Sequence, residues 1–216
     1  MIDSGEIVAW YHEPRRRGED RYKASHGQEH PMDDSDGADS ATEERAGSGG
    51  SAAGPADGTA MSGRDRRMLT RVADYQWGPP AGEALFAGED VTVTHTSSGR
   101  PRQVRGPAGR LVTYATDGRF TLGLAGGHRL QGELSDGAYR VVVGSESEPY
   151  VRDGRNTFAK FVSAADSAIR PGDEVLVTHE RGDLLAVGRA EVSGEAMLEF
   201  ETGMAVFVRE GNDGDN

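Results

Sequence analysis

The sequence predicts an α+β fold that is mostly β, with a small closed β-barrel at the C-terminal end, a small α/β domain before it and a disordered N-terminal region. Short β-branched and aromatic runs alternate with Gly, Pro, Asp and Ser turn signals from residue 90 onward. Few segments have helical patterning, and an acidic stretch rich in Ala, Gly and Ser precedes them. With 216 residues, the chain is long enough for one or two small domains.

Residues 1–61 form the first part and carry 6 basic against 13 acidic residues. High net charge, few aromatic residues and the Gly/Ala/Ser tract from Ala46 to Ala60 leave too little apolar surface to offset the loss of chain entropy. We therefore expect this region to be disordered. Because Met32 and Met61 are both possible starts, an upstream misassigned start site remains an alternative.

Residues 62–137 are predicted to form a small α+β domain. Short helices are expected over Arg67–Ala73 and Gly126–Leu134, and the second places Leu130 and Leu134 four residues apart on one face. β-branched and aromatic residues bounded by turn signals predict strands over Asp90–Thr96, Arg110–Thr116 and Arg119–Ala125.

Residues 138–211 are predicted to form the barrel, and 212–216 a short tail. Ser193 is a good N-cap for a helix that places Met197 and Phe200 on one face. A closed barrel covered by short helices is favoured because an open sheet would leave strand edges unpaired. Strands are expected over Tyr139–Gly144, Thr157–Ser163, Glu174–Glu180, Asp183–Val192 and Met204–Glu210.

No group of residues has the pattern of a catalytic or metal site. The absence of Cys excludes a disulfide framework, a thiolate zinc site and a cysteine nucleophile. His26 and His30 stand four residues apart but lie in the acidic region beside Pro31, and the glycine-rich segment 123–128 lacks the Lys-Ser/Thr ending of a phosphate-binding loop. We therefore predict a protein that is not an enzyme and uses no metal or other cofactor.

Charge and hydropathy indicate the cellular environment in which the protein works. The net charge is -12 and the basic residues are 22 Arg against 2 Lys, which is typical of a protein kept soluble in a salt-rich, halophilic cell. No apolar run approaches the roughly 18 residues of a membrane-spanning helix, and the start lacks the apolar core of a signal peptide. We expect a cytoplasmic protein that does not bind a membrane.

Residues 139–211 contain, in this order, VVV, PYVRDG, NTFAKFV, RPGDEVLV, LLAVGRA, SGEAML and GMAVFVRE. This order and spacing resemble the PUA domain. The preceding ADYQWGPPAGEALF, SSGRPRQV and DGRFTLGLAGGHRL are similar to the region before the PUA domain of archaeal tRNA-guanine transglycosylases and archaeosine synthases, so the resemblance covers about residues 71–211. The catalytic barrel and cysteine-rich zinc site of that family are missing, Arg155 stands where the family often has Lys, and Trp77 where Phe is usual.

PUA domains are compact β pseudo-barrels that bind structured RNA, so the resemblance implies an RNA ligand. In the family, RNA lies against positions that match Pro149–Gly154, Arg155–Asn156, Phe158–Lys160 and Val206–Arg209 here. Gly154 allows a positive φ and close approach of the backbone, and Asn156 can bond a 2′-hydroxyl or a base edge. Four side chains are assigned to phosphates: Arg152, Arg155, Lys160 and Arg209.

The basic hairpin with Arg100, Arg102 and Arg105 would extend this RNA surface. Arg170, Arg181 and Arg189 are left out because nearby acidic residues suffice to pair with them. The sequence thus predicts a non-catalytic, archaeal RNA-binding module, most simply a tRNA reader that serves a modification enzyme for archaeosine or pseudouridine. The alternatives are a protein-interaction module with an acidic contact surface, or an accessory subunit of a tRNA-guanine transglycosylase, an archaeosine synthase or a pseudouridine synthase. A further interpretation makes the chain an active subunit of a split transglycosylase.

Overall fold

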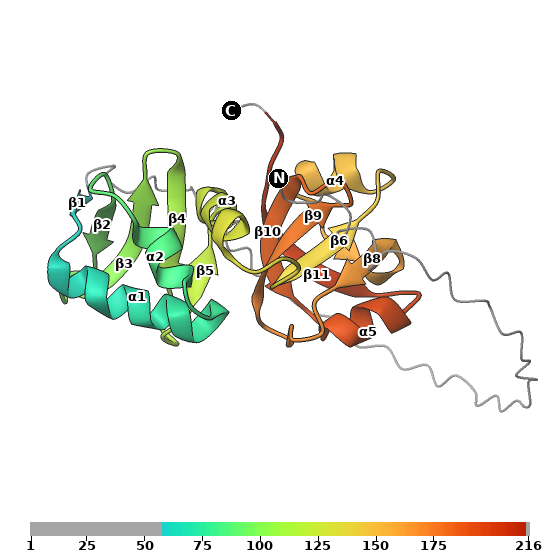
Figure 1. Cartoon of the computed structure of the whole chain (residues 1–216), viewed down its shortest axis with the longest axis horizontal. Helices are drawn as coiled ribbons and strands as arrows, with labels where there is room; N and C mark the ends of the chain where they lie inside the picture. Colours follow the sequence, from blue (N-terminus) through green and yellow to red (C-terminus); the bar gives the residue numbers. More distant parts are fainter. Residues whose placement is uncertain (1–57, 215–216) are drawn as a thin grey trace, which may run out of the picture. The chain divides into compact units, whose positions relative to one another are not determined.

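The computed structural model describes residues 58–214, which contain two β-sheets with short helices (Figure 1). The fold is mostly β, with an α/β region followed by a near-closed barrel, as the sequence predicts. No described helix is long and apolar enough to cross a membrane.

The first sheet is an antiparallel meander with strand order β1-β2-β3-β4-β5. Figure 1 shows α1 and α2 lying over one face of this sheet. Its elements are β1 (Thr59–Ala60), α1 (Gly63–Trp77), α2 (Ala81–Phe86), β2 (Thr92–His95), β3 (Pro101–Gly106), β4 (Gly109–Tyr114), β5 (Phe120–Leu122) and α3 (Leu124–Glu133).

Helix α1 forms because its cap and its apolar spacing agree. The Ser62 hydroxyl accepts a hydrogen bond from the backbone N–H of Asp65 and caps the first turn. Leu69, Ala73 and Trp77 follow at four-residue intervals and are buried against the sheet. The predicted helix over residues 67–73 is therefore the centre of a longer one.

Two sequence predictions for this domain need correction. The last residues of the predicted disordered region, 58–61, are described, and β1 pairs with β2 there; the rest of that region lies outside the described residues. The segment between Thr96 and Arg110, for which the sequence predicts a basic hairpin but names no strand, contains a full strand, β3. This strand pairs with β2 on one side and β4 on the other, and its Val104 is fully buried. The predicted burial of Leu130 and Leu134 is confirmed.

The second sheet has the strand order β7-β11-β10-β9-β6-β8, with one parallel pair, β6 and β9. Its elements are β6 (Arg140–Val143), α4 (Glu148–Arg152), β7 (Thr157–Phe158), the 3₁₀ helix η1 (Ala159–Phe161), β8 (Val162–Ala165), β9 (Glu174–His179), β10 (Leu184–Ala190), α5 (Gly194–Glu199) and β11 (Met204–Gly211).

The strand predicted over Thr157–Ser163 is two strands in the structure. β7 lies at one edge of the second sheet and β8 at the other, and only η1 separates them in the chain. A single connection between opposite edges brings those edges together, so the sheet is a near-closed barrel. The 3₁₀ helix η1 turns the chain between them, so that residues 157–158 pair with β11 and residues 162–165 pair with β6.

Helix α5 covers part of the barrel. The predicted cap is confirmed, since the Ser193 hydroxyl accepts from the backbone N–H of Ala196. Met197 is fully buried, but Phe200 is 49% exposed. The helix ends at Glu199 and Phe200 is extended, so the predicted shared face of Met197 and Phe200 is wrong.

The two sheets share contacts around β9. The indole Nε1 of Trp77 donates to the carbonyl oxygen of Glu174 at 3.1 Å, and the Leu122 N–H donates to the Glu174 carboxylate at 2.9 Å. Leu176 and Val187 belong to the same buried apolar cluster as the first sheet. The barrel is therefore joined to the α/β domain by both hydrogen bonds and apolar packing.

Candidate nucleic-acid interface

The candidate interface begins with α4 and the loop that follows it. The helix ends in a Schellman arrangement, in which the Gly154 N–H donates to Val151 O at 3.0 Å and the Arg155 N–H to Tyr150 O at 2.9 Å. Gly154 has φ +79°, a conformation that residues with a Cβ rarely adopt. The tight turn leaves Arg155 directly after the helix end, on the surface.

Strand β11 holds this loop in place. The side-chain oxygen of Asn156 accepts a hydrogen bond from the Val208 N–H at 3.0 Å. A Cβ at Gly211 would collide with the carbonyl oxygen of Arg152, so the end of β11 lies directly against the end of α4. Arg152 also donates through Nη1 to Asn212 O at 3.0 Å. The loop is thus fixed from three points.

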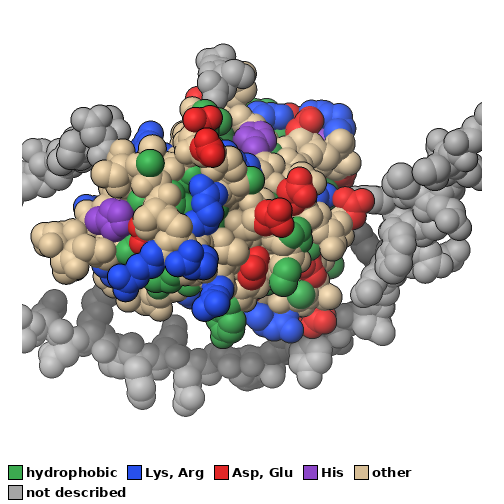
Figure 2. All heavy atoms as spheres, turned by 60° about the vertical axis from the view of Figure 1, so that its left-hand side comes forward, with side chains coloured by type: hydrophobic (Ala, Val, Ile, Leu, Met, Phe, Trp, Pro, Cys, Tyr) green, Lys and Arg blue, Asp and Glu red, His purple; other side chains and the backbone are tan. Residues whose placement is uncertain are grey.

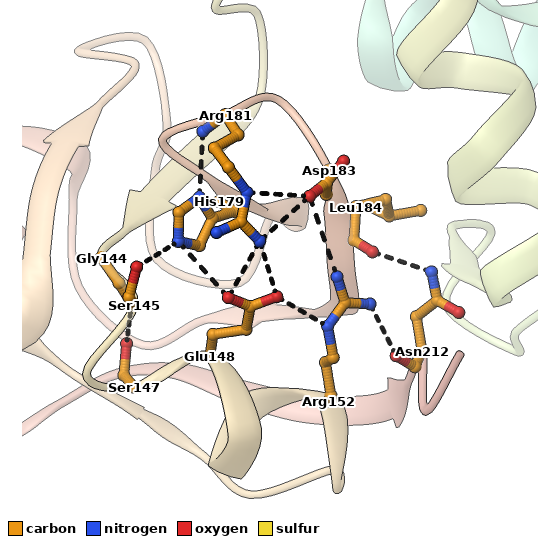
Figure 3. A network of polar contacts seen from close by, with 10 residues as sticks. All are labelled: Gly144, Ser145, Ser147, Glu148, Arg152, His179, Arg181, Asp183, Leu184 and Asn212. Atoms are coloured by element: carbon orange, nitrogen blue, oxygen red, sulfur yellow. Dashed lines mark hydrogen bonds and ion pairs between the residues drawn. The ribbon is translucent and has the colours of Figure 1, made fainter. Parts of the chain in front are cut away.

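A polar network anchors the start of α4 (Figure 3). The Glu148 carboxylate accepts from Arg152 Nε and from Arg181 Nη2, each at 3.0 Å. These bonds, with that from Arg152 contributing most, lower the pKa of Glu148. The buried His179 accepts from the Arg181 N–H through Nδ1, and its Nε2 lies 3.1 Å from Ser145 Oγ and 3.5 Å from the Glu148 carboxylate.

The predicted RNA contacts divide into two groups in the structure. Arg155 and Lys160 are exposed: the Arg155 side chain is 68% exposed with only a 3.3 Å contact to the equally exposed Asp153, and Lys160 Nζ lies over the Phe161 ring at 4.6 Å. Exposed pairs of this kind are weak and are readily exchanged for another anion.

Arg152, Asn156 and Arg209 are instead occupied in holding the fold. Arg209 Nε donates at 3.0 Å to the carboxylate of the buried Glu174, and burial raises the pKa of that carboxyl. Asn156 and Arg152 support the loop as described above. The assignment of Arg152, Asn156 and Arg209 to RNA remains a prediction. Because these side chains already bond to other parts of the protein, they have fewer free hydrogen-bonding groups for RNA than the sequence implied.

The basic hairpin is also divided. Arg100 donates to the carbonyl oxygens of Tyr114 and Ala115 and lies over the Tyr114 ring, whereas Arg102 and Arg105 are exposed. Arg105 has one 3.3 Å contact, to the Gln103 side chain.

Exposed aromatic side chains accompany the basic ones, and three of them lie within the ranges that the resemblance assigns to RNA. Tyr150 is 58% exposed, and Phe158 and Phe207 are also largely open to solvent. The Arg155 guanidinium lies 5.8 Å from the Tyr150 ring centre, and Arg189 lies at the same distance from Phe207. Alternation of aromatic and basic side chains on a surface suits stacking of bases beside bound phosphates.

An open hollow of about 200 Å³ adjoins Lys160. Its wall includes the Phe161 ring and the side chains of Glu146, Ser147 and Glu180. It is large enough for one small polar group. Within residues 58–214, no three His, Asp or Glu side chains come close enough together to hold a metal ion.

Comparison with known protein families identifies the two domains of the chain. Residues 67–136 match the patch-forming domain C2 of tRNA-guanine transglycosylase, and residues 139–211 match the PUA domain. The chain contains a PUA domain, preceded by a C2 domain.

The relatives of this PUA domain protein include archaeal tRNA-guanine(15) transglycosylases. The chain is 47% identical over 149 residues to that of Pyrococcus abyssi, which is 68% of this chain and 25% of the relative. It is 47% identical over 144 residues to that of Pyrococcus furiosus, covering 66% of this chain and 24% of the relative. The PUA domain protein therefore spans about a quarter of the length of these relatives, in their C-terminal region.

Two solved structures show the same fold. A hypothetical protein from Pyrococcus horikoshii OT3 superimposes with a TM-score of 0.53 at 23% identity, over 71% of the PUA domain protein and 93% of that chain. A PUA domain from Aeropyrum pernix K1 does so with a TM-score of 0.51 at 20% identity, over 74% and 87% of the two chains.

Proposed function

We propose that this PUA domain protein is a non-catalytic module that binds tRNA and serves a tRNA-modifying enzyme. The observation that carries the proposal is the fixed loop after α4, which presents Arg155 over the Tyr150 ring. Phe158 and Lys160, both exposed, follow in the same segment of the PUA domain. The transglycosylase relatives, which share both domains with this chain, support tRNA as the RNA class.

The side chains on this surface suit complementary parts of an RNA. Guanidinium and ammonium groups bind phosphates with charge-assisted hydrogen bonds, and aromatic faces stack on unpaired bases. Because Gly154 lacks a side chain, the backbone of the turn is open to a ribose or a phosphate. We assign the main contacts to Arg155 and Lys160, with Arg102 and Arg105 as further ones; Arg152, Asn156 and Arg209 act mainly by shaping the surface.

An accessory role follows from the relatives. The tRNA-guanine(15) transglycosylases are about four times longer than the part of this chain that matches them. About three quarters of each transglycosylase therefore has no counterpart in the match. We propose that the module works beside a separate catalytic chain for archaeosine or pseudouridine formation. A cytoplasmic location in a salt-rich archaeal cell is consistent with this role and with the net charge of -12.

Fluorescence anisotropy of the full chain, titrated with archaeal tRNA with and without its 3′ single-stranded end, tests the proposed function. Saturable binding that weakens when the end is trimmed supports a reader of the acceptor end. Absence of saturable binding to either RNA contradicts the proposal and favours the protein-interaction alternative, in which the acidic surface contacts a partner enzyme.

A further inference from the structure

Most arginines among residues 58–214 donate to a carboxylate, a carbonyl or an amide oxygen. The side chains of four arginines make no hydrogen bond or ion pair within the described part of the chain: Arg64, Arg67, Arg71 and Arg102. Three of these four belong to α1. In a chain with net charge -12, three arginines without an acidic partner on one helix need an explanation.

The three side chains lie on one line. At 3.6 residues per turn, Arg64, Arg67 and Arg71 fall within an arc of about 60° on the outer face of α1, and their Cα atoms span about 10.5 Å along the axis. All three are exposed, while the opposite face carries the buried Leu69 and Ala73. None of the three is therefore required for packing of the helix.

The acidic residues of α1 do not form ion pairs with this line, because the carboxylates of both face other partners. The Asp65 carboxylate accepts from Ser62 Oγ and lies 3.3 Å from His95 Nε2. The Asp74 carboxylate accepts from the Gly82 N–H at 2.7 Å. Both lie at the sides of the helix, outside the arc of the arginines.

The same outer face carries Met68, which is partly exposed, and Tyr75, which is 93% exposed. Figure 2 brings this side of the α/β domain forward and shows Lys and Arg side chains gathered in its lower left part, with most acidic side chains further to the right. The face is thus basic, with one fully available aromatic ring.

We propose that the outer face of α1 binds the phosphodiester backbone of the RNA. We call this face, defined by Arg64, Arg67, Arg71 and Tyr75, the α1 face. A line of like charges about one helical turn apart fits a ligand with a regular repeat of negative charge, and guanidinium groups bind phosphates bidentately. The inference rests on the proposed function and adds a contact in the C2 domain, separate from the surface around α4.

An acidic protein is the other class of ligand that this charge would attract. RNA is favoured because the arginines form an unbroken line and Tyr75 offers a free face for a base or a sugar beside it. A protein contact would depend chiefly on burial of Tyr75 and Met68 in an apolar pocket of the partner.

The test is the salt dependence of tRNA binding by the full chain and by the variant Arg64→Gln/Arg67→Gln/Arg71→Gln. Gln has a helix propensity close to that of Arg, and the three side chains are exposed and make no hydrogen bond or ion pair within residues 58–214, so the fold should be retained. Each lost phosphate contact lowers the slope of log K against log salt by roughly 0.7 to 0.9. We expect a slope smaller by about 2 and weaker binding at low salt.

A charge-matched control separates local contacts from net charge. Ser135→Glu/Ser167→Glu/Ala168→Glu changes the charge by the same amount at exposed positions outside α1 and the α4 loop. It should leave the slope close to that of the wild type. If the α1 variant has the wild-type slope, or changes no more than this control, the inference is overturned.

Two further comparisons identify which proposal fails. If Arg155→Gln/Lys160→Gln weakens tRNA binding while the α1 variant does not, only the α1 face is excluded. If the wild type does not bind tRNA, the proposed function fails and the inference with it. Polyglutamate serves as a protein-like polyanion: loss of polyglutamate binding with unchanged tRNA binding would assign the face to an acidic protein and overturn the RNA contact.

Discussion

Arg209 Nε lies 3.0 Å from the carboxylate of Glu174, whose side chain is only 4% exposed. The second carboxylate oxygen of Glu174 accepts from the Leu122 N–H in the other sheet, and its backbone carbonyl accepts from the Trp77 indole. Arg209 therefore pairs with a buried acidic side chain that joins the barrel to the α/β domain at β9. Its main role is structural, although the resemblance places it in the RNA surface.

Arg209→Gln should lower the free energy of unfolding by about 2 to 3 kcal/mol, because it leaves a buried carboxylate without its cation. The loss is smaller than the roughly 3 to 5 kcal/mol expected for a fully buried pair, since the Arg209 side chain is partly exposed. Urea unfolding of the full chain measures it. A variant of wild-type stability that had nonetheless lost tRNA binding would show that Arg209 is a direct contact.

The stability of the protein should also depend on the charge of Glu174. Burial raises the pKa of Glu174 above its ordinary value of 4.5, so the folded state holds this proton more tightly than the unfolded chain does. The stability that Glu174 contributes is present below pH 4.5 and is lost as the pH rises through its folded-state pKa.

The difference in free energy of unfolding between the wild type and Glu174→Gln isolates this effect. Measured by urea unfolding from pH 4 to pH 8, the difference should move against the wild type as the pH rises and then level off. A difference that stays constant across the series would mean that Arg209 fully compensates for the burial of the carboxylate.

Gly154→Ala should distort the turn after α4. At φ +79° a Cβ is strained by roughly 1 to 2 kcal/mol, so the loop would be destabilised or would adopt another conformation. We expect lower thermal stability and weaker tRNA binding. Gly132→Ala is the matched control: it lies in α3 with open space around it, and should stabilise the helix by about 0.5 to 1 kcal/mol without affecting RNA. Equal effects of the two substitutions would contradict the role of the turn.

Tyr150→Ala should weaken tRNA binding by about 5-fold or more, since a stacked base contributes roughly 1 to 3 kcal/mol. The ring is 58% exposed, so the free energy of unfolding should change little. Anisotropy and urea unfolding, measured on the same preparation, separate the two effects. Unchanged affinity would show that bases do not stack at this position.

Local patterns account for the fold class and for most elements. The Ser193 cap and the apolar spacing of Leu69 and Ala73 have local causes and are readable in the sequence. The division of residues 157–163 into β7 and β8 has no local signal, because it depends on pairing of β7 with β11 at one edge and of β8 with β6 at the other, and neither partner strand is adjacent in the sequence. β3 was missed for a related reason: its pairing on both sides, more than its composition, makes it a strand.

The candidate site was predictable in position but less so in role. Residue type and resemblance predict both Arg155 and Arg209 as RNA contacts. Only the fold shows that Arg155 is open to solvent and that Arg209 is bonded to Glu174. The α1 face was missed although Arg64, Arg67 and Arg71 have helical spacing in the sequence. Its significance depends on Asp65 and Asp74 being bonded elsewhere, which spacing alone does not reveal.

The affinity of Arg155→Gln/Lys160→Gln for intact tRNA, relative to the wild type at one salt concentration, tests the central claim most directly. Two charge-assisted phosphate contacts contribute about 1.5 to 3 kcal/mol each, so we expect binding to weaken by at least 10-fold while stability is unchanged. The control Ser135→Glu/Ala168→Glu makes the same change in net charge and should weaken binding far less. An affinity equal to that of the wild type would contradict an RNA-binding surface at the loop after α4.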